Sequence, residues 1–219
     1  IAIFWTVPTA GLLITSFRPA ADVRRTGWWT VFVDPEFTTK NYVDVLGTSN
    51  VADSFFNSFI ITIPAVLIPI MLALLAAYAF AWIDFRGRNA LFAFVFALQV
   101  VPIQVTLIPL LSQYVQWGLD GTFWTVWLSH TIFGLPLAIF LLHNFMKEIP
   151  RSLIEAARVD GAGHVRVFFQ VLLPLLVPAI ASFAIFQFLW VWNDLLVGLT
   201  FAGGTVDVAP ITVYLSNIK

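Results

Sequence analysis

The chain has 219 residues, of which 60% are hydrophobic and 11% are charged, and its mean hydropathy is +0.91. A soluble domain usually carries about 25% charged residues, so much of this exterior must be solvated by lipid. The net charge of −1 gives no sign of a nucleic-acid partner, and the lack of cysteine excludes disulfides and thiolate metal sites. We therefore expect an all-α fold, a polytopic bundle of membrane helices.

Charge-free runs place these helices along the chain. Four runs contain no Asp, Glu, Lys or Arg, and each exceeds the roughly 20 residues that a membrane-spanning helix needs: 54–83, 89–119, 121–146 and 167–193. With the uncharged first 17 residues, they predict about five membrane helices, near 1–17, 55–82, 90–113, 122–146 and 168–200. No basic segment precedes the first run, as a signal peptide would require, so we interpret it as a truncated first membrane helix.

The segment 18–53 is rich in turn residues and carries four basic and five acidic side chains. A short capped helix is expected to start within Thr38–Tyr42. Trp28 and Trp29 suit the headgroup level of a bilayer, and interfacial anchoring is the preferred interpretation over ligand contact.

The distribution of basic residues predicts the orientation. Arg86 and Arg88 lie in the loop 83–89, and four basic residues lie in the loop 147–167, whereas the loop near 114–121 has no Lys or Arg. Because Lys and Arg are retained on the cytoplasmic side, the two basic loops are expected to be cytoplasmic and residues 18–53 external.

The second basic loop contains the most informative stretch, residues 149–162, with the sequence IPRSLIEAARVDGA. Ser152 and Glu155 have the spacing of a capping box, and Gly161 is placed to end a short helix. A helix this short is marginal alone in water, which favours docking on a partner. A plain surface linker between two spans is an equally weighted alternative on these residues alone.

This loop resembles the EAA signature of binding-protein-dependent ABC importer permeases, and its Asp160-Gly161-Ala162 version is similar to the carbohydrate-uptake, maltose-permease-like branch. The matching residues are Glu155, Ala156, Ala157 and Gly161, with Val171-x-Leu-Pro174 following. Shorter pieces extend the resemblance over most of the chain: Asn57-Ser58, Ala77-Tyr78-Ala79-Phe80, Phe85-Arg86-Gly87-Arg88, Pro102 with Pro109, and Trp192-Asn193-Asp194.

The resemblance implies a multi-pass permease in a bacterial or archaeal cell membrane, with six membrane helices expected in the family. It implies a second homologous permease, two ATP-binding cassette ATPase subunits, an extracytoplasmic solute-binding protein and a sugar substrate as partners. The chain is then a single permease domain, 1–219, truncated at both ends, and residues 147–170 form the cytoplasmic coupling loop. Glu155, Ala156, Ala157, Asp160 and Gly161 are the expected ATPase-coupling residues.

Polar residues inside apolar runs are candidates for the solute path. Asn193 ends the fifth run and Asp194 follows it, and Gln99 and Gln104 lie within the third run, 89–119. Intramembrane polar groups are functional hypotheses by default, yet helix–helix hydrogen bonding is the more common role. The histidines His130 and His143 are expected to be neutral and packed.

The preferred class of function is an importer permease without catalytic residues, cofactor or metal, which forms half of the solute path. ATP chemistry is expected on other subunits, since this chain has no phosphate-binding Gly-x-x-x-x-Gly-Lys motif. A permease for a sugar-like solute such as a glycerol phosphate is the first alternative. A secondary transporter predicts more buried ionisable groups than the spans contain, and a membrane enzyme predicts a catalytic set that is not found.

Overall fold

The computed structural model describes residues 2–48, 50–202 and 207–217, and this part of the chain is helical with no strand. The all-α class is therefore confirmed. The chain divides into two compact units, Ile1–Asp53 and Ser54–Lys219.

The first unit is organised around a buried cation. It comprises α1 (Ala2–Ser16), α2 (Ala20–Arg25), the 3-10 helix η1 (Trp28–Phe32) and α3 (Lys40–Thr48). Arg18 is 4% exposed, and its guanidinium donates hydrogen bonds to the Gly27 carbonyl and to Thr30 Oγ1, both at 3.0 Å. The expected helix start is observed, because α3 begins at Lys40, whose N–H is bonded to Thr38 Oγ1.

Three helices of the second unit are long and apolar enough to cross a membrane. They are α4 (Val51–Trp82), α7 (Phe123–Glu148) and a continuous 29-residue helix built from α9 (His164–Val167), η3 (Phe168–Leu172) and α10 (Leu173–Trp192). The first two agree with the predicted spans 55–82 and 122–146. Their facing sides enclose an apolar core whose largest fully buried members include Leu142, Met146, Leu172 and Leu176.

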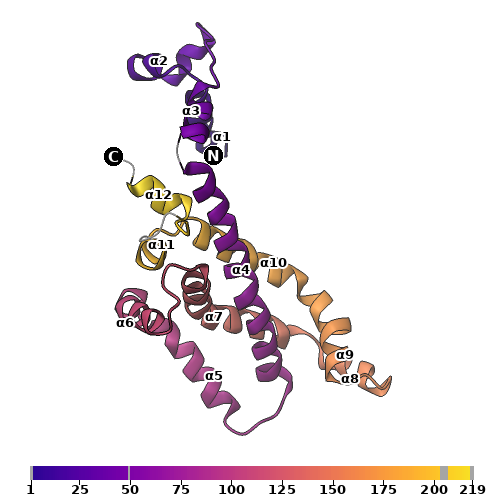
Figure 1. Ribbon diagram of the computed structural model, residues 1–219. Coiled ribbons are helices and arrows are strands. Elements are labelled where there is room, and N and C mark those ends of the chain that lie inside the picture. The colour runs from indigo at the N-terminus through magenta and orange to yellow at the C-terminus, as the bar shows by residue number, and fades with distance from the viewer. Residues whose placement is uncertain (1, 49, 203–206, 218–219) are drawn as a thin grey trace. The chain divides into compact units, whose positions relative to one another are not determined.

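The predicted span 90–113 is not one straight helix. It consists of α5 (Arg88–Ala97), the 3-10 turn η2 (Leu98–Val100) and α6 (Ile103–Gln116), with a bend of 99° between the two halves (Figure 1). The cause is Pro102, which has no N–H for the helix and forces Val101 before it into an extended conformation, with ψ of 119°. The other prolines of the long helices, Pro64, Pro69, Pro136 and Pro178, remain inside continuous helix.

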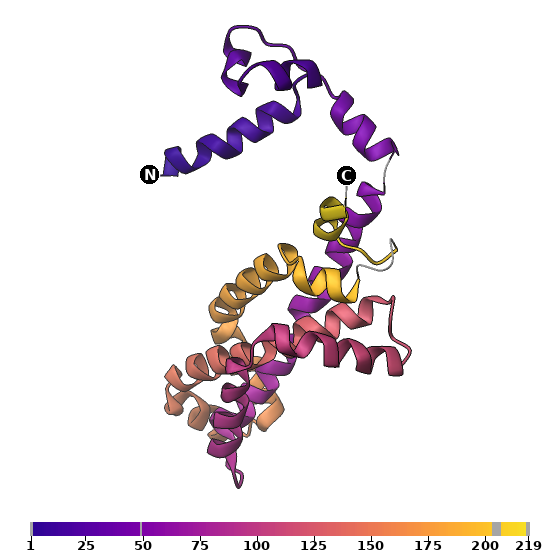
Figure 2. The same cartoon turned by 90° about the vertical axis from the view of Figure 1, so that its left-hand side faces the viewer.

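The predicted span 168–200 is wrong in its C-terminal part, because α10 ends at Trp192. The Asn193 side chain donates a hydrogen bond back to the Leu189 carbonyl, and the chain then turns into the short helices α11 (Leu196–Phe201) and α12 (Ile211–Asn217). Both lie beside the first half of α4 in two perpendicular views (Figures 1 and 2).

The helix turn η3 is wider than an α-helix, and the sequence explains why. Pro174 has no N–H for the carbonyl four residues earlier, and the preceding turn, Phe168–Leu172, has π-helical bonding. The loop between α7 and α9 contains one further helix, α8 (Arg151–Val159).

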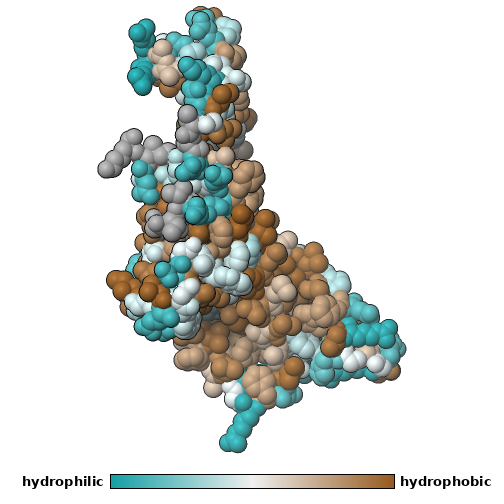
Figure 3. All heavy atoms as spheres, in the orientation of Figure 1, coloured by the Kyte–Doolittle hydropathy of each residue, from teal (hydrophilic) through white to brown (hydrophobic). Residues whose placement is uncertain are grey.

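The surface of the second unit fits a lipid environment. Figure 3 shows hydrophobic side chains over α4 and α10, whereas hydrophilic residues gather at α8 and at the α4–α5 loop. Of the five expected membrane helices, three are continuous, one is the bent α5–α6 pair, and α1 has 15 residues, fewer than the roughly 20 of a full span.

Candidate coupling loop and solute path

The start of α8 differs from the expected capping box. The N-cap position is Pro150, no side chain caps the helix, and the first helical residue is Arg151. Ser152 is therefore the second helical residue, and Glu155 lies beyond the first turn. A capping box requires the serine outside the helix, so the prediction from the Ser152–Glu155 spacing was wrong.

The end of α8 is a Schellman motif centred on Gly161. The Gly161 N–H donates to the Arg158 carbonyl at 3.0 Å, and the Ala162 N–H donates to the Ala157 carbonyl at 2.9 Å. Gly161 has φ of +80°, a left-handed conformation that residues with a Cβ atom rarely adopt. The predicted helix stop at Gly161 is thus observed, and it requires glycine for a backbone reason.

The two faces of α8 differ sharply. Ile154 is buried in the core shared by α4, α7 and α10, and Ala157 packs against the same core. Glu155, Ala156 and Asp160 are exposed. The bundle therefore holds the helix on one side while the motif residues Glu155 and Ala156 are available on the other.

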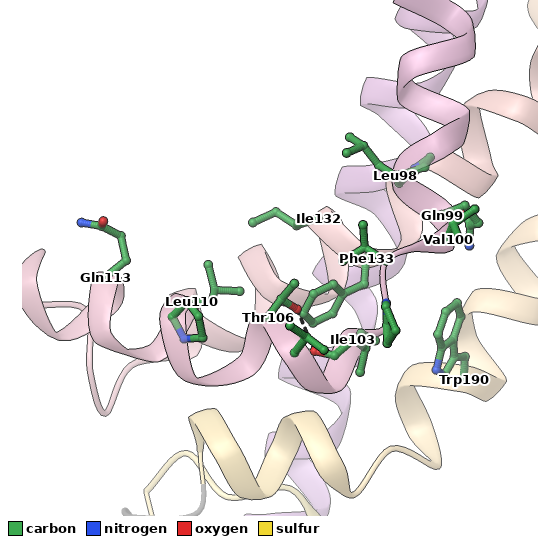
Figure 4. Close-up of a pocket in the computed structure, with 15 residues that line it drawn as sticks. Leu98, Gln99, Val100, Ile103, Thr106, Leu110, Gln113, Ile132, Phe133 and Trp190 are labelled. Atoms are coloured by element: carbon green, nitrogen blue, oxygen red, sulfur yellow. Dashed lines mark hydrogen bonds between the residues drawn. The ribbon is translucent and has the colours of Figure 1, made fainter.

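A cavity of about 830 Å³ lies at the break between α5 and α6. Its polar side chains are Gln99, Thr106 and Gln113, and its aromatic ones are Phe133 of α7 and Trp190 of α10. In Figure 4, Trp190 and Gln113 lie at opposite ends of the cavity, and residues of η2 and α6 line the space between them. None of the lining side chains is charged.

The four candidate path residues are not brought together. Gln99 lines the cavity, whereas Gln104, Asn193 and Asp194 do not. Gln104 is exposed on the first turn of α6. The assignment of these residues to a solute path stays a prediction.

Asp194 has a set of structural contacts. Its carboxylate accepts hydrogen bonds from the backbone N–H groups of Gly198 at 2.8 Å and Val197 at 3.3 Å, so it caps α11. Its backbone carbonyl accepts a bond from Thr212 Oγ1 at 2.7 Å. His130 Nε2 lies 3.9 Å from Asp194 Oδ2, beyond hydrogen-bond distance.

Asn57 and Ser58 have a structural role that their sequence context did not reveal. Asn57 Nδ2 donates to the carbonyl of Asp207 at 2.9 Å, and Ser58 Oγ accepts the N–H of Ile211 at 2.9 Å. These bonds fasten the segment before α12 to α4. His130 and His143 are both buried, and no group of residues that could hold a metal occurs in the described part of the chain.

Trp190, Phe133 and the Tyr78–His164 pair were not singled out from the sequence. No sequence feature distinguishes these aromatic residues from the others in the apolar runs, because 16% of this chain is aromatic. Pro102 was the available signal for the break in the predicted span 90–113, but seven other prolines in the predicted spans gave the same signal.

Comparison with known proteins agrees with this arrangement of a polytopic helix bundle with a short helix in one loop. Over 98% of its length, the chain superposes with a TM-score of 0.77 and 22% identity on 74% of a chain in the crystal structure of a bacterial ABC transporter involved in the import of the acidic polysaccharide alginate. At that identity the likeness shows the fold.

Sequence relatives define the family. Over 222 residues the chain is 56% identical to the osmoprotective compounds uptake permease protein GgtD of Synechocystis, covering 100% of this chain and 74% of GgtD. It is 46% identical over 214 residues to the alpha-glucoside transport system permease protein AglG of Rhizobium meliloti, covering 93% of this chain and 56% of AglG. Residues 65–217 match the family of binding-protein-dependent transport system inner membrane components, and the chain belongs to that family.

Proposed function

We propose that this chain is the membrane-spanning permease subunit of an ATP-driven importer, that it forms half of the translocation path for a sugar or oligosaccharide, and that α8 couples it to ATPase subunits. The observation that carries the proposal is α8 itself. It is a short helix between two membrane spans, anchored through Ile154 and presenting Glu155 and Ala156. A helix of nine residues has little stability of its own, and a partner surface accounts for its exposed motif.

The proposed partners are two ATP-binding cassette subunits, a second homologous permease and an extracytoplasmic solute-binding protein. Family membership supports an ATPase and a binding protein as partners, since the family is that of binding-protein-dependent systems. The second permease is proposed because the cavity, which residues of η2, α6, α7 and α10 line, is open to the surroundings rather than enclosed by this chain.

The cavity supports a neutral, hydroxyl-rich solute. Amide and hydroxyl groups of Gln99, Thr106 and Gln113 can exchange hydrogen bonds with hydroxyls, and the Trp190 indole offers a flat apolar face for a sugar ring. The lining has no cation to pair with a phosphate, which argues against the glycerol phosphate alternative.

The relatives suggest two kinds of solute. The name of AglG refers to alpha-glucosides and that of GgtD to osmoprotective compounds. The second kind is favoured as a specific candidate by the 56% identity to GgtD over the whole chain. The test is a complex reconstituted with purified binding protein, in which ATP hydrolysis and uptake are measured with an alpha-glucoside and with a small osmolyte. We expect the osmolyte to stimulate both activities, and stimulation by the alpha-glucoside alone would favour the first kind of solute.

Coupling through α8 is tested by charge reversal at Glu155. We expect Glu155→Lys to reduce the amount of ATPase subunit that co-purifies with the permease, because the exposed carboxylate is lost from the docking face. Glu36→Lys, at an exposed glutamate of the first unit and outside the loop 147–170, is the matched control. Normal ATPase retention and normal uptake in Glu155→Lys would overturn the assignment of α8 as the coupling helix.

A further inference from the structure

One hydrogen bond joins the C-terminal end of α4 to the segment that follows α8. Tyr78 Oη and His164 Nδ1 are 2.7 Å apart, although the two residues are separated by 86 positions in the chain. Tyr78 lies one turn before the end of α4, and His164 is the first residue of α9.

The environments of the two side chains are unequal. Tyr78 is buried, and its ring packs edge-to-face against Phe168, with centroids 5.5 Å apart. His164 is exposed, so burial does not determine where its ring lies. The hydrogen bond and the edge contact with Tyr78, at a centroid distance of 6.0 Å, fix it instead.

The connection from His164 back to α8 is short and rigid. Ala162 is bonded to α8 through its N–H, which leaves Gly163 as the one residue between the Schellman motif and His164. Gly163 is also held, because its carbonyl accepts the N–H of Val167 at 3.0 Å. Holding His164 therefore holds the C-terminal end of α8.

We propose that Tyr78 and His164 are positioning residues, and that their hydrogen bond links the coupling helix α8 to the α4 span so that a displacement of α8 is passed to α4. This inference rests on the proposed role of α8. The covalent chain already carries such a displacement into α10, through the continuous helix that starts at His164. Near the C-terminal end of α4, the hydrogen bond adds a directional polar link between α4 and the segment after α8, beside the packing of Ile154 in the shared core.

The proposal predicts a defect in coupling rather than in assembly. Tyr78→Phe removes the hydroxyl and keeps the ring contact with Phe168, so the complex should form and hydrolyse ATP. We expect the solute imported per ATP hydrolysed to fall about 2- to 10-fold, the equilibrium factor that corresponds to one net hydrogen bond. His164→Leu should give the same loss, and the double variant should be no worse than either single one, because both remove the same bond.

A conservative variant and a matched control complete the test. His164→Asn places an amide close to the position of Nδ1 and should recover most of the coupling. Tyr114→Phe is the control, since Tyr114 is another buried tyrosine in a membrane helix whose hydroxyl is hydrogen bonded, to Ser129 at 3.2 Å. The assays are uptake and ATP hydrolysis in the same proteoliposomes, with co-purification of the ATPase subunits.

Three results would contradict the proposed link between α8 and α4. Wild-type coupling in Tyr78→Phe, an equal loss in Tyr114→Phe, or additive losses in the double variant would overturn the proposal. If the proposed function itself is wrong, the result differs: ATPase subunits would not co-purify with the wild-type permease, or Glu155→Lys would leave the amount that co-purifies unchanged.

Discussion

Replacement of Gly161 by valine is the perturbation whose effect the structure defines best. Gly161 has φ of +80°, and a Cβ atom built there meets nothing within 4 Å. The cost is therefore backbone strain without a clash, about 1–2 kcal/mol for an L-residue in the left-handed region, and β-branching adds to it. That energy corresponds to a roughly 5- to 30-fold loss in the population of the native α8 exit.

We expect Gly161→Val to reduce ATPase co-purification or the solute imported per ATP by up to this factor, while the protein still inserts in the membrane. Gly161→Asn should be milder, because asparagine tolerates positive φ better than other residues. Gly87→Val is the matched control: Gly87 has φ of +85°, equally open surroundings and a place in the other basic loop. Normal coupling in Gly161→Val, or an equal defect in Gly87→Val, would refute the reasoning.

Two further predictions concern topology and the fifth apolar run. Because the chain has no native cysteine, single cysteines at Gly87 and Gly118 can be labelled with an impermeant reagent in intact cells; we expect labelling at Gly118 alone, and the reverse pattern would invert the proposed orientation. Asp194→Ala removes both hydrogen bonds that cap α11 and should destabilise the purified protein by about 0.5–2 kcal/mol in thermal unfolding, whereas Asp194→Asn retains one acceptor oxygen and should cost less. Unchanged thermal stability in Asp194→Ala, with transport lost, would favour the solute path over this structural role.

The membrane spans could be predicted because their signal, a run of residues without charge, lies within one continuous stretch of sequence. Lipid does not solvate ionised side chains, so charge-free runs mark α4 and α7 to within a few residues. Gly161 was predictable for a related reason, since a helix stop with positive φ needs a particular residue type at one position.

Contacts between distant residues were not predictable from the sequence. Asn57 reaches the carbonyl of Asp207 across 150 positions, and Tyr78 reaches His164 across 86, and neither spacing has a local signature. The capping box failed through a small register error: α8 starts at Arg151, which moves Ser152 from the cap into the helix. Pro102 breaks its helix while Pro136 remains inside one, although both are prolines within charge-free runs, so the sequence did not distinguish them.

The break at Pro102 has a consequence for hydration. A helix interrupted inside a bilayer leaves main-chain carbonyl and amide groups that acyl chains cannot satisfy, so such a break is stable only against protein or water. Here the break lines the cavity beside Trp190, a space large enough to hold water molecules. Part of the polarity of this cavity is thus supplied by the backbone, in addition to the side chains of Gln99, Thr106 and Gln113. Under the proposed function, substitutions of the side chains around the cavity can therefore change the choice of solute while the backbone break at Pro102 stays in place.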